Sequence, residues 1–233
     1  MSTLPNRPNT RAGRCAVVAA AVVFAASCVA PALASVRMGV DIGANLSSLR
    51  YGPLDAFPAF ASGWDPGWRT SITGGASLEF PFRRRVSVVT GLRYVQQGNR
   101  VKLDFPGPPR LTGEFRIAQH YIAVPVLLAF RPIPLRRFFV AAGPEGALLL
   151  NGKLLTDYSS PPAQPSSSDD ITLRLNQANV WLAAETGLEF PVGKHFGAVT
   201  LRYTHGLVDA EKKDDWAIPW KTRGFEGLVG MRW

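Results

Sequence analysis

The chain has 233 residues, a formal net charge of +9 and only two cysteines, Cys15 and Cys28. Both cysteines lie in the first 34 residues, so residues 35–233 have no cysteine for a disulfide scaffold, a thiolate zinc site or a cysteine nucleophile. Three of the excess positive charges also lie in the first segment, which leaves +6 for the remainder. Such a surplus favours a polyanionic partner, either nucleic acid or a membrane surface.

The N-terminal segment has the features of a secretory signal peptide. Arg7, Arg11 and Arg14 precede an apolar run from Cys15 to Ala30, and Ala32-Leu33-Ala34 forms a small-x-small cleavage site. The run is shorter than the roughly 20 apolar residues that a membrane-spanning helix needs. We therefore predict a signal peptide at 1–34 and one domain at 35–233.

A secretory route makes a membrane surface the better explanation for the positive charge, and we expect no nucleic-acid partner. The arginines concentrate in turns, whereas a nucleic-acid interface needs a basic face interleaved with aromatic residues. Ala26-Ser27-Cys28 loosely resembles a lipoprotein cleavage site. It lacks the usual leucine three residues before the cysteine, so cleavage at Cys28 is the alternative to cleavage after Ala34.

The rest of the chain alternates apolar and polar residues with a period of two, which is typical of strands with two different faces. In the first such segment Met38, Val40 and Ile42 share one face, and Asp41 and Asn45 share the other. Each segment is predicted to be close to the ~9–11 residues of a tilted membrane strand. The eight predicted strands are Val36–Ser47, Trp68–Phe80, Val86–Gln97, Gln119–Phe130, Phe138–Leu150, Gln177–Phe190, Val199–Thr204 and Phe225–Trp233.

The lengths of the connections alternate strictly, which distinguishes the possible all-β folds. Short links follow the second, fourth and sixth strands, at Pro81–Arg85, Arg131–Arg137 and Pro191–His195. Long links follow the others, at Leu49–Gly67, Gly98–Gly113, Asn151–Thr172 and Val208–Pro219. Period-two alternation also fits a soluble sandwich or a lipocalin-like barrel, but a soluble sandwich has no reason to alternate its link lengths, whereas outer-membrane barrels do so. We predict an eight-stranded antiparallel up-and-down transmembrane β-barrel with short periplasmic turns and long extracellular loops, located in the outer membrane.

The polar face of the strands must then point inward. An eight-stranded barrel is just wide enough for side chains to fill it, so we predict a polar, filled lumen without an aqueous channel. Glu185 and Arg202 are symmetric about the turn at Gly193-Lys194 and should face each other. The predicted lumen network comprises Glu79, Arg93, Glu145, Glu185, Glu189, Arg202, Glu226 and Arg232.

Aromatic residues gather near both ends of the predicted strands. Those near the short turns should form an interfacial girdle, namely Phe80, Phe130, Phe138, Phe190 and Trp233. Those near the first long link form either a loop contact surface or an extension of the girdle, namely Tyr51, Phe57, Phe60, Trp64 and Trp68.

The chain resembles the PorT-like outer-membrane β-barrel proteins, which are grouped with small barrels of the outer-membrane protein A type. The resemblance covers about Val36 to Trp233. It rests on Gly39-Val40-Asp41-Ile42-Gly43, Gly91-Leu92-Arg93-Tyr94-Val95-Gln96-Gln97-Gly98, Tyr121-Ile122-Ala123-Val124-Pro125-Val126-Leu127-Leu128, Gly143-Pro144 and Leu201-Arg202-Tyr203-Thr204-His205-Gly206-Leu207. The ending Gly230-Met231-Arg232-Trp233 is similar to the C-terminal signal read by the barrel-insertion machinery, although Phe is more usual than Trp233 in the last position. The resemblance implies fold and location, and some relatives are associated with protein secretion.

The function favoured by the sequence is non-enzymatic, with a structural, assembly or surface-interaction role. Its expected partners are outer-membrane lipid and lipopolysaccharide, the barrel-insertion machinery, and an unidentified protein bound through the loops. One alternative is an accessory barrel of a protein-secretion system, and another is a lipopolysaccharide-modifying enzyme using His120 or His205 near the long links. The chain lacks a Gly-x-Ser-x-Gly motif for that enzyme. A carrier of small hydrophobic molecules fits poorly with the charged lumen, and no cofactor or metal site is expected because no nucleotide loop or ligand spacing occurs.

Overall fold

The computed structural model describes residues 36–51, 64–105, 111–132, 137–158, 166–210 and 220–233. These contain ten strands and one 3-10 helix, η3 (Thr172–Arg174). The predicted signal peptide and its cleavage site lie outside the described residues. Within them, no helix is long and apolar enough to cross a membrane. The strands are β1 (Arg37–Tyr51), β2 (Trp64–Gly67), β3 (Arg69–Arg83), β4 (Val86–Phe105), β5 (Leu111–Phe130), β6 (Phe138–Tyr158), β7 (Ser167–Asp170), β8 (Ala178–Val192), β9 (His195–Gly206) and β10 (Trp220–Arg232).

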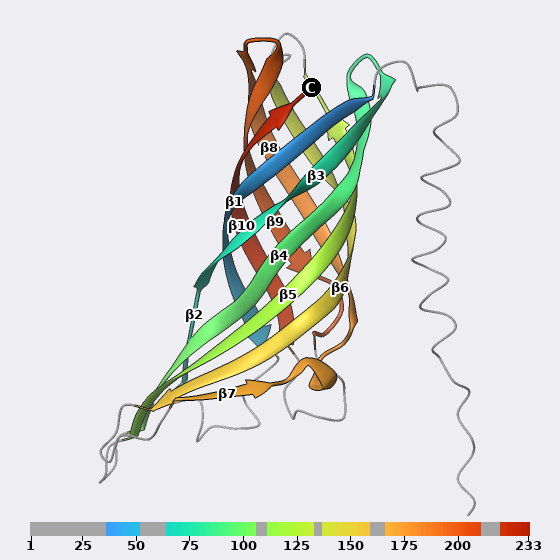
Figure 1. Cartoon of the computed structure of the whole chain (residues 1–233). Helices are drawn as coiled ribbons and strands as arrows, with labels where there is room; N and C mark the ends of the chain where they lie inside the picture. The colour runs from blue at the N-terminus through green and yellow to red at the C-terminus, as the bar shows by residue number, and fades with distance from the viewer. Residues whose placement is uncertain (1–35, 52–63, 106–110, 133–136, 159–165, 211–219) are drawn as a thin grey trace, which may run out of the picture.

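Eight of these strands close into an antiparallel barrel, as predicted (Figure 1). Each pairs with its neighbour in the order β1, β3, β4, β5, β6, β8, β9 and β10, and β10 returns to β1. The closing seam runs from Gly39 opposite Arg232 to Tyr51 opposite Trp220. Closure matters because hydrocarbon offers backbone N–H and C=O groups no water, so every one must be satisfied within the protein.

The face assignment from the sequence is also confirmed. Ile42 and Leu201 are each 65% exposed on the outside, whereas Asn45 and Thr200 are buried on the inside. Val89 and Val95, which interrupt the predicted alternation of β4, point inward and contact buried side chains. An apolar exterior around a buried polar interior is the arrangement that lipid surroundings require.

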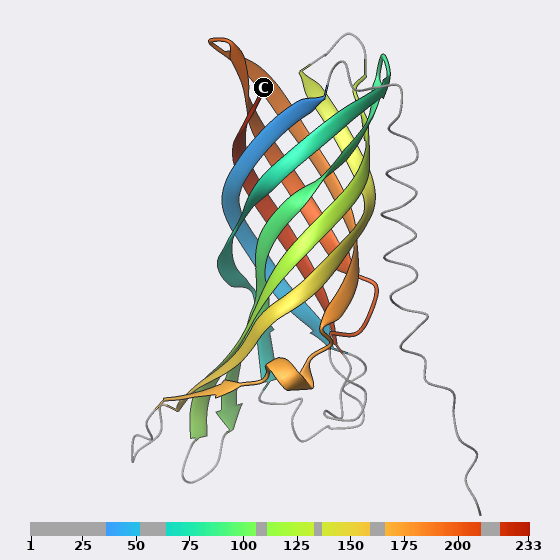
Figure 2. The ribbon, with the colours of Figure 1, turned by 45° about the vertical axis from the view of Figure 1, so that its right-hand side comes forward.

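The predicted strand lengths are wrong for the middle of the chain, where β4, β5 and β6 have 20, 20 and 21 residues. The sequence prediction ended these strands at glycine and asparagine residues that resemble loop formers. Pairing instead continues to Phe105 opposite Leu111 and to Tyr158 opposite Gly113. The predicted long links at 98–113 and 151–172 are therefore largely strand. Residues 98–105, 111–119 and 151–158 form what we call the strand extension, which projects beyond the barrel in Figures 1 and 2.

Two short strands accompany the strand extension. β2 pairs with β4 between Trp64 and Gly67, inside the first predicted long link, and β7 pairs with β6. At the opposite end two residues each join β3 to β4 and β8 to β9. β8 and β9 are joined by Gly193-Lys194, where Gly193 has a φ of 60°, a left-handed conformation that glycine adopts without steric cost.

The backbones of β1 and β10 approach each other closely at Gly43 in the closing seam. A Cβ at Gly43 would lie 1.9 Å from the carbonyl oxygen of Gly227, whereas a Cβ at Gly227 would meet nothing within 4 Å. We expect Gly43→Ala to lower the free energy of unfolding by about 1–3 kcal/mol, the usual cost of overpacking. Urea unfolding of the refolded barrel measures this, with Gly227→Ala as the matched control. Equal stability of the two variants would contradict the packing of the seam.

Candidate functional site

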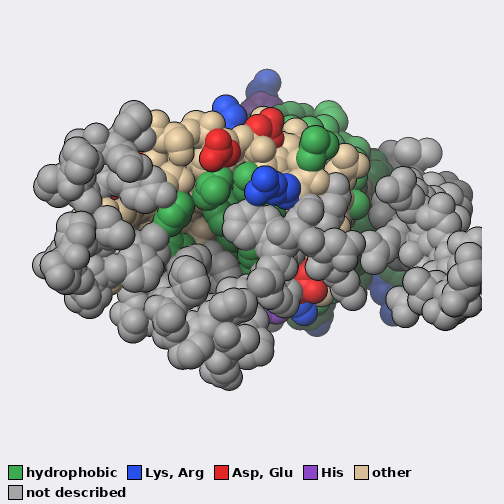
Figure 3. Space-filling model, turned by 90° about the horizontal axis from the view of Figure 1, so that it is seen from below, with side chains coloured by type: hydrophobic (Ala, Val, Ile, Leu, Met, Phe, Trp, Pro, Cys, Tyr) green, Lys and Arg blue, Asp and Glu red, His purple; other side chains and the backbone are tan. Residues whose placement is uncertain are grey.

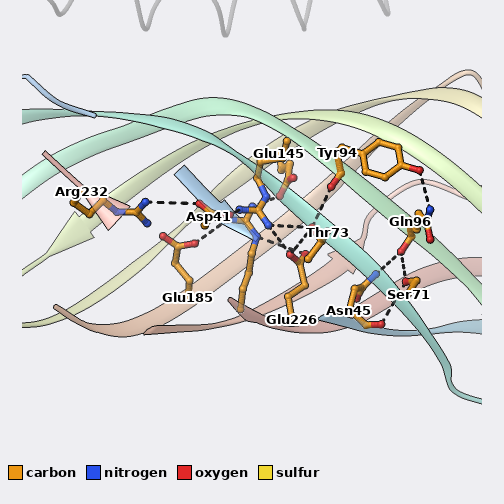
Figure 4. A network of polar contacts seen from close by, with 12 residues as sticks. Asp41, Asn45, Ser71, Thr73, Tyr94, Gln96, Glu145, Glu185, Glu226 and Arg232 are labelled. Atoms are coloured by element: carbon orange, nitrogen blue, oxygen red, sulfur yellow. Dashed lines mark hydrogen bonds and ion pairs between the residues drawn. The ribbon is translucent and has the colours of Figure 1, made fainter. Parts of the chain in front are cut away.

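The lumen contains a central charged network built on two arginines from opposite sides of the barrel. Arg202 of β9 forms ion pairs with Glu145 of β6 and, at 2.8 Å, with Glu185 of β8. Arg93 of β4 lies 2.6 Å from Glu226 of β10, which joins the two halves because Glu226 also lies 3.9 Å from Arg202. Figure 4 shows Glu145, Glu185 and Glu226 close together at the centre of this network.

Asp41 of β1 and Thr73 of β3 complete the central network. Asp41 lies 3.0 Å from Arg93 and 3.8 Å from Arg232, and the hydroxyl of Thr73 donates to Glu226 over 3.1 Å. The described network thus has three arginines and four carboxylates, on side chains that are nearly all buried. Burying charge without pairing it would be prohibitive, so the pairing is what permits this polar interior.

A second network lies toward the short-turn end. Arg131 forms an ion pair with Glu79 and lies 3.1 Å from Glu189, and Arg37 lies 3.3 Å from Glu189 and 3.7 Å from Glu79. The hydroxyl of Ser87 donates to Glu79. Two cations therefore balance two anions in this layer.

The structure distributes all eight residues of the predicted lumen network between these two networks. The expected pair of Glu185 and Arg202 is confirmed, since the two residues are direct partners between β8 and β9. Three charged members were missing from the prediction. Arg37 and Asp41 lie on the predicted polar face and could have been included, whereas Arg131 was assigned to a turn and gave no periodic signal.

The space left between these side chains is small. A cavity of about 20 Å³ lies among the inward residues of the central network, including Asp41, Arg93 and Arg202. That is room for about one water molecule. Glu145 and Glu226 each have one buried carboxylate oxygen without a hydrogen-bond partner among the described residues, and a water there would satisfy such an atom.

Toward the long-loop end apolar side chains share the lumen with buried amides such as Gln97 and Gln119, and the alternation did not predict this apolar share. Tyr121 and Trp181 meet edge to face with ring centroids 5.1 Å apart. Beyond them lies a buried cluster that includes residues from β1, β5, β10 and the link around η3, namely Leu49, Ile117, Ile171, Leu175, Ala210 and Trp220. The inward face of the strand extension supplies Ile117 and, packed against it, Leu154. This apolar cluster fills the barrel where the strands leave the membrane.

The outward face of the strand extension is charged. Glu114 accepts hydrogen bonds from both Arg100 and Arg116, and Arg116 also lies 3.7 Å from Asp157. The hydrogen bond from Arg100 holds the pKa of Glu114 below its usual range, and burial acts in the opposite direction. Lys102 lies directly across from Glu114 and is exposed. Figure 3 views this end of the molecule and shows charged and hydrophobic side chains intermingled among the described residues.

The two histidines of the proposed lipid enzyme each lie beside a tyrosine. His120 Nδ1 is 2.6 Å from the Tyr94 hydroxyl, and His205 Nδ1 is 3.3 Å from the Tyr203 hydroxyl. The hydroxyl of Tyr94 also accepts a hydrogen bond from Gln96. No serine, carboxylate or metal-ligand cluster joins either histidine among the described residues. Each histidine thus has a tyrosine hydroxyl as its partner but no carboxylate that would orient it as a general base.

The predicted aromatic groups are only partly described. At the short-turn end Phe130, Phe190 and Trp233 are well exposed, as a girdle requires, and Phe80 and Phe138 are half-buried. Trp233 is also tied to β1, because its backbone exchanges two 3.0 Å hydrogen bonds with Met38. At the other end Trp68 is exposed. Phe57 and Phe60 lie outside the described residues, and only the backbone of Tyr51 and Trp64 is described.

Arg202 is the most sensitive position in the central network. Arg202→Met should lower the free energy of unfolding by about 3–5 kcal/mol, because it leaves three buried carboxylates with less compensation. Arg100→Met removes an exposed ion pair and should cost far less. Adding Glu145→Gln to Arg202→Met should recover part of the loss. Urea unfolding checks all three, and equal costs for Arg202→Met and Arg100→Met would refute the network's contribution.

Comparisons with solved structures find similar chains in several bacteria. Ail, the attachment invasion locus protein of Yersinia pestis, is 14% identical with a TM-score of 0.37, and the match covers 85% of this chain and 99% of that one. The outer membrane protein OprG from Pseudomonas aeruginosa is 15% identical with a TM-score of 0.36, covering 84% and 95%. The outer membrane protease OmpT from Escherichia coli is 5% identical with a TM-score of 0.35, covering 86% and 96%.

No curated protein sequence matches the chain significantly. A family model described as the outer membrane protein beta-barrel domain matches residues 29–211, which is most of the chain. That match agrees with the closed antiparallel barrel, its apolar exterior and its outer-membrane location. The chain belongs to the outer membrane protein beta-barrel domain family.

Proposed function

We propose that this protein is a non-enzymatic outer-membrane barrel that binds a partner at the cell surface through its strand extension. The observation that carries the proposal is the continuation of β4, β5 and β6 past the barrel as a paired sheet. Connecting the barrel strands would require only loops, not a paired sheet of this length. A paired sheet instead holds side chains in fixed positions outside the membrane.

The two faces of the strand extension support this role. Its inward face is anchored to the barrel, since Ile117 and Leu154 pack in the apolar cluster that includes Leu49. Its outward face presents Arg100, Lys102 and Arg116 beside two acids, Glu114 and Asp157. A rigid, charged surface of this kind suits a polar partner, because electrostatic complementarity guides association and selects the partner.

The alternative role is that of an accessory barrel in a protein-secretion system, which the resemblance to PorT-like proteins suggests. Its partners would approach from the periplasmic side. The turn between β3 and β4 offers exposed Arg84 and Arg85 there, and the turn between β8 and β9 offers exposed Lys194. Solvated basic turns are common, so these turns support the secretion role less strongly than the strand extension supports surface binding.

Photo-crosslinking in intact cells separates the two roles. A crosslinking amino acid at Lys102 should give a discrete adduct, and the same probe at Arg84 should not. Arg100→Glu with Arg116→Glu should abolish the adduct at position 102, because the double change reverses the charge of the surface. The barrel should stay folded in that variant, since both arginine side chains are about half exposed. An adduct at position 84 alone would instead favour the secretion role.

Lipid analysis tests the enzymatic alternative. His120 and His205 are each beside a tyrosine, and no carboxylate joins either pair among the described residues. We therefore expect the mass spectrum of lipid A from cells producing the protein to match that from cells lacking it. A new acylation state that disappears with His120→Ala or His205→Ala would establish an enzyme and overturn the non-enzymatic role.

A further inference from the structure

A row of outward-facing residues crosses three strands where the barrel meets the long-loop end. Arg223 of β10 is the direct partner of Ser48 in β1 and of His205 in β9. Trp68 immediately precedes β3, whose first residue, Arg69, is the partner of Ser47. The Arg223 guanidinium lies over the Trp68 ring at 5.0 Å from its centroid. Ser48 is short, which leaves room for that guanidinium to reach the ring. Stacking on an aromatic face holds an arginine in place while its N–H groups remain available.

Two more cations lie in the next row of lipid-facing residues, farther from the membrane centre. Arg50 of β1 and Lys221 of β10 are direct cross-strand partners, and they share the outward face with Arg223. Like charges directly opposite each other destabilise a sheet. Within the described residues none of the three forms an ion pair with a carboxylate, and the Nε of Arg223 is buried without a hydrogen-bond partner. The described residues therefore supply these three cations with no anionic partner. We call Arg50, Lys221, Arg223 and Trp68 the cationic patch.

The cationic patch lies directly above the apolar band of the barrel. The next outward row toward the membrane centre contains Leu46 and Phe225, and Phe225 packs against Trp68 and Tyr203 with centroids 5.7 and 4.8 Å apart. Leu46 and Phe225 are both about half exposed. Aromatic residues in this position mark the boundary between hydrocarbon and headgroups. The cationic patch thus lies at headgroup depth and faces sideways into the lipid.

We propose that the cationic patch binds the phosphorylated headgroup of a glycolipid in the outer leaflet. The depth and sideways orientation favour a lipid whose acyl chains lie along Leu46 and Phe225. Three cations suit a dianionic phosphate, because Arg223 presents a planar guanidinium fork and Arg50 and Lys221 supply further donors. This inference goes beyond surface binding by the strand extension, since it concerns different residues and a ligand within the membrane.

Native mass spectrometry of the full barrel in detergent tests the proposal. The probes are diphosphorylated lipid A, the same lipid after removal of both phosphates, and inorganic phosphate. We expect the barrel to retain diphosphorylated lipid A and to lose the dephosphorylated lipid. An equal concentration of inorganic phosphate should not displace the bound diphosphorylated lipid A. Lys221→Gln with Arg223→Gln should weaken retention of diphosphorylated lipid A on the order of tenfold.

The matched control removes the same number of charges at the other end of the barrel. Arg84→Gln with Arg85→Gln should leave retention unchanged. An equal loss of lipid A retention in both double variants would mean that the binding is unspecific electrostatic attraction. Displacement of the lipid by inorganic phosphate would mean that the site binds free anions. Either result overturns the proposal. If the Lys221/Arg223 variant does not fold, as judged by its heat-dependent gel mobility, Trp68→Ala and Arg50→Gln replace it, and unchanged retention in both overturns the proposal equally.

Discussion

The pairing of β1 with β10 is the constraint on which the rest of the structure depends. Without this seam two strands would present unpaired backbone groups to hydrocarbon, where each costs several kcal/mol. With the seam closed, the ladder is continuous around eight strands. The narrow interior that results must be filled by side chains alone, and this requirement determines the composition of the inward face.

Filling that interior with charge makes the register specific. A slip of one residue would move the inward carboxylates and arginines to the lipid face and the apolar residues into the lumen. Each of Arg93, Arg131 and Arg202 contacts carboxylates from two or more strands, so the networks connect strands that are not neighbours. Buried ion pairs add little net stability, but breaking one is costly. We infer that the networks act mainly to exclude other registers.

Much of this could be read from the sequence because a barrel strand obeys one simple period. Alternation identified the faces of all eight strands, and turn symmetry identified the pair of Glu185 and Arg202. The sequence pattern could not identify where β4, β5 and β6 end. Cross-strand pairing and the apolar cluster around Ile117 extend these strands past Gly98 and Asn151. Arg131 reaches the lumen from beyond the end of β5, where no period remains. The contact of Arg223 with Trp68 joins residues 155 positions apart and depends on the closed seam. No local pattern contains that information.

Disulfide trapping across the seam tests barrel closure most directly. Ile42 and Val229 are direct partners in β1 and β10. In a chain whose Cys15 and Cys28 are replaced by serine, Ile42→Cys with Val229→Cys should cross-link in the outer-membrane fraction upon oxidation. Ile42→Cys with Phe225→Cys, four residues out of register, should not. Failure of the first pair to cross-link in folded protein, or equal cross-linking of both pairs, would contradict a closed barrel in this register.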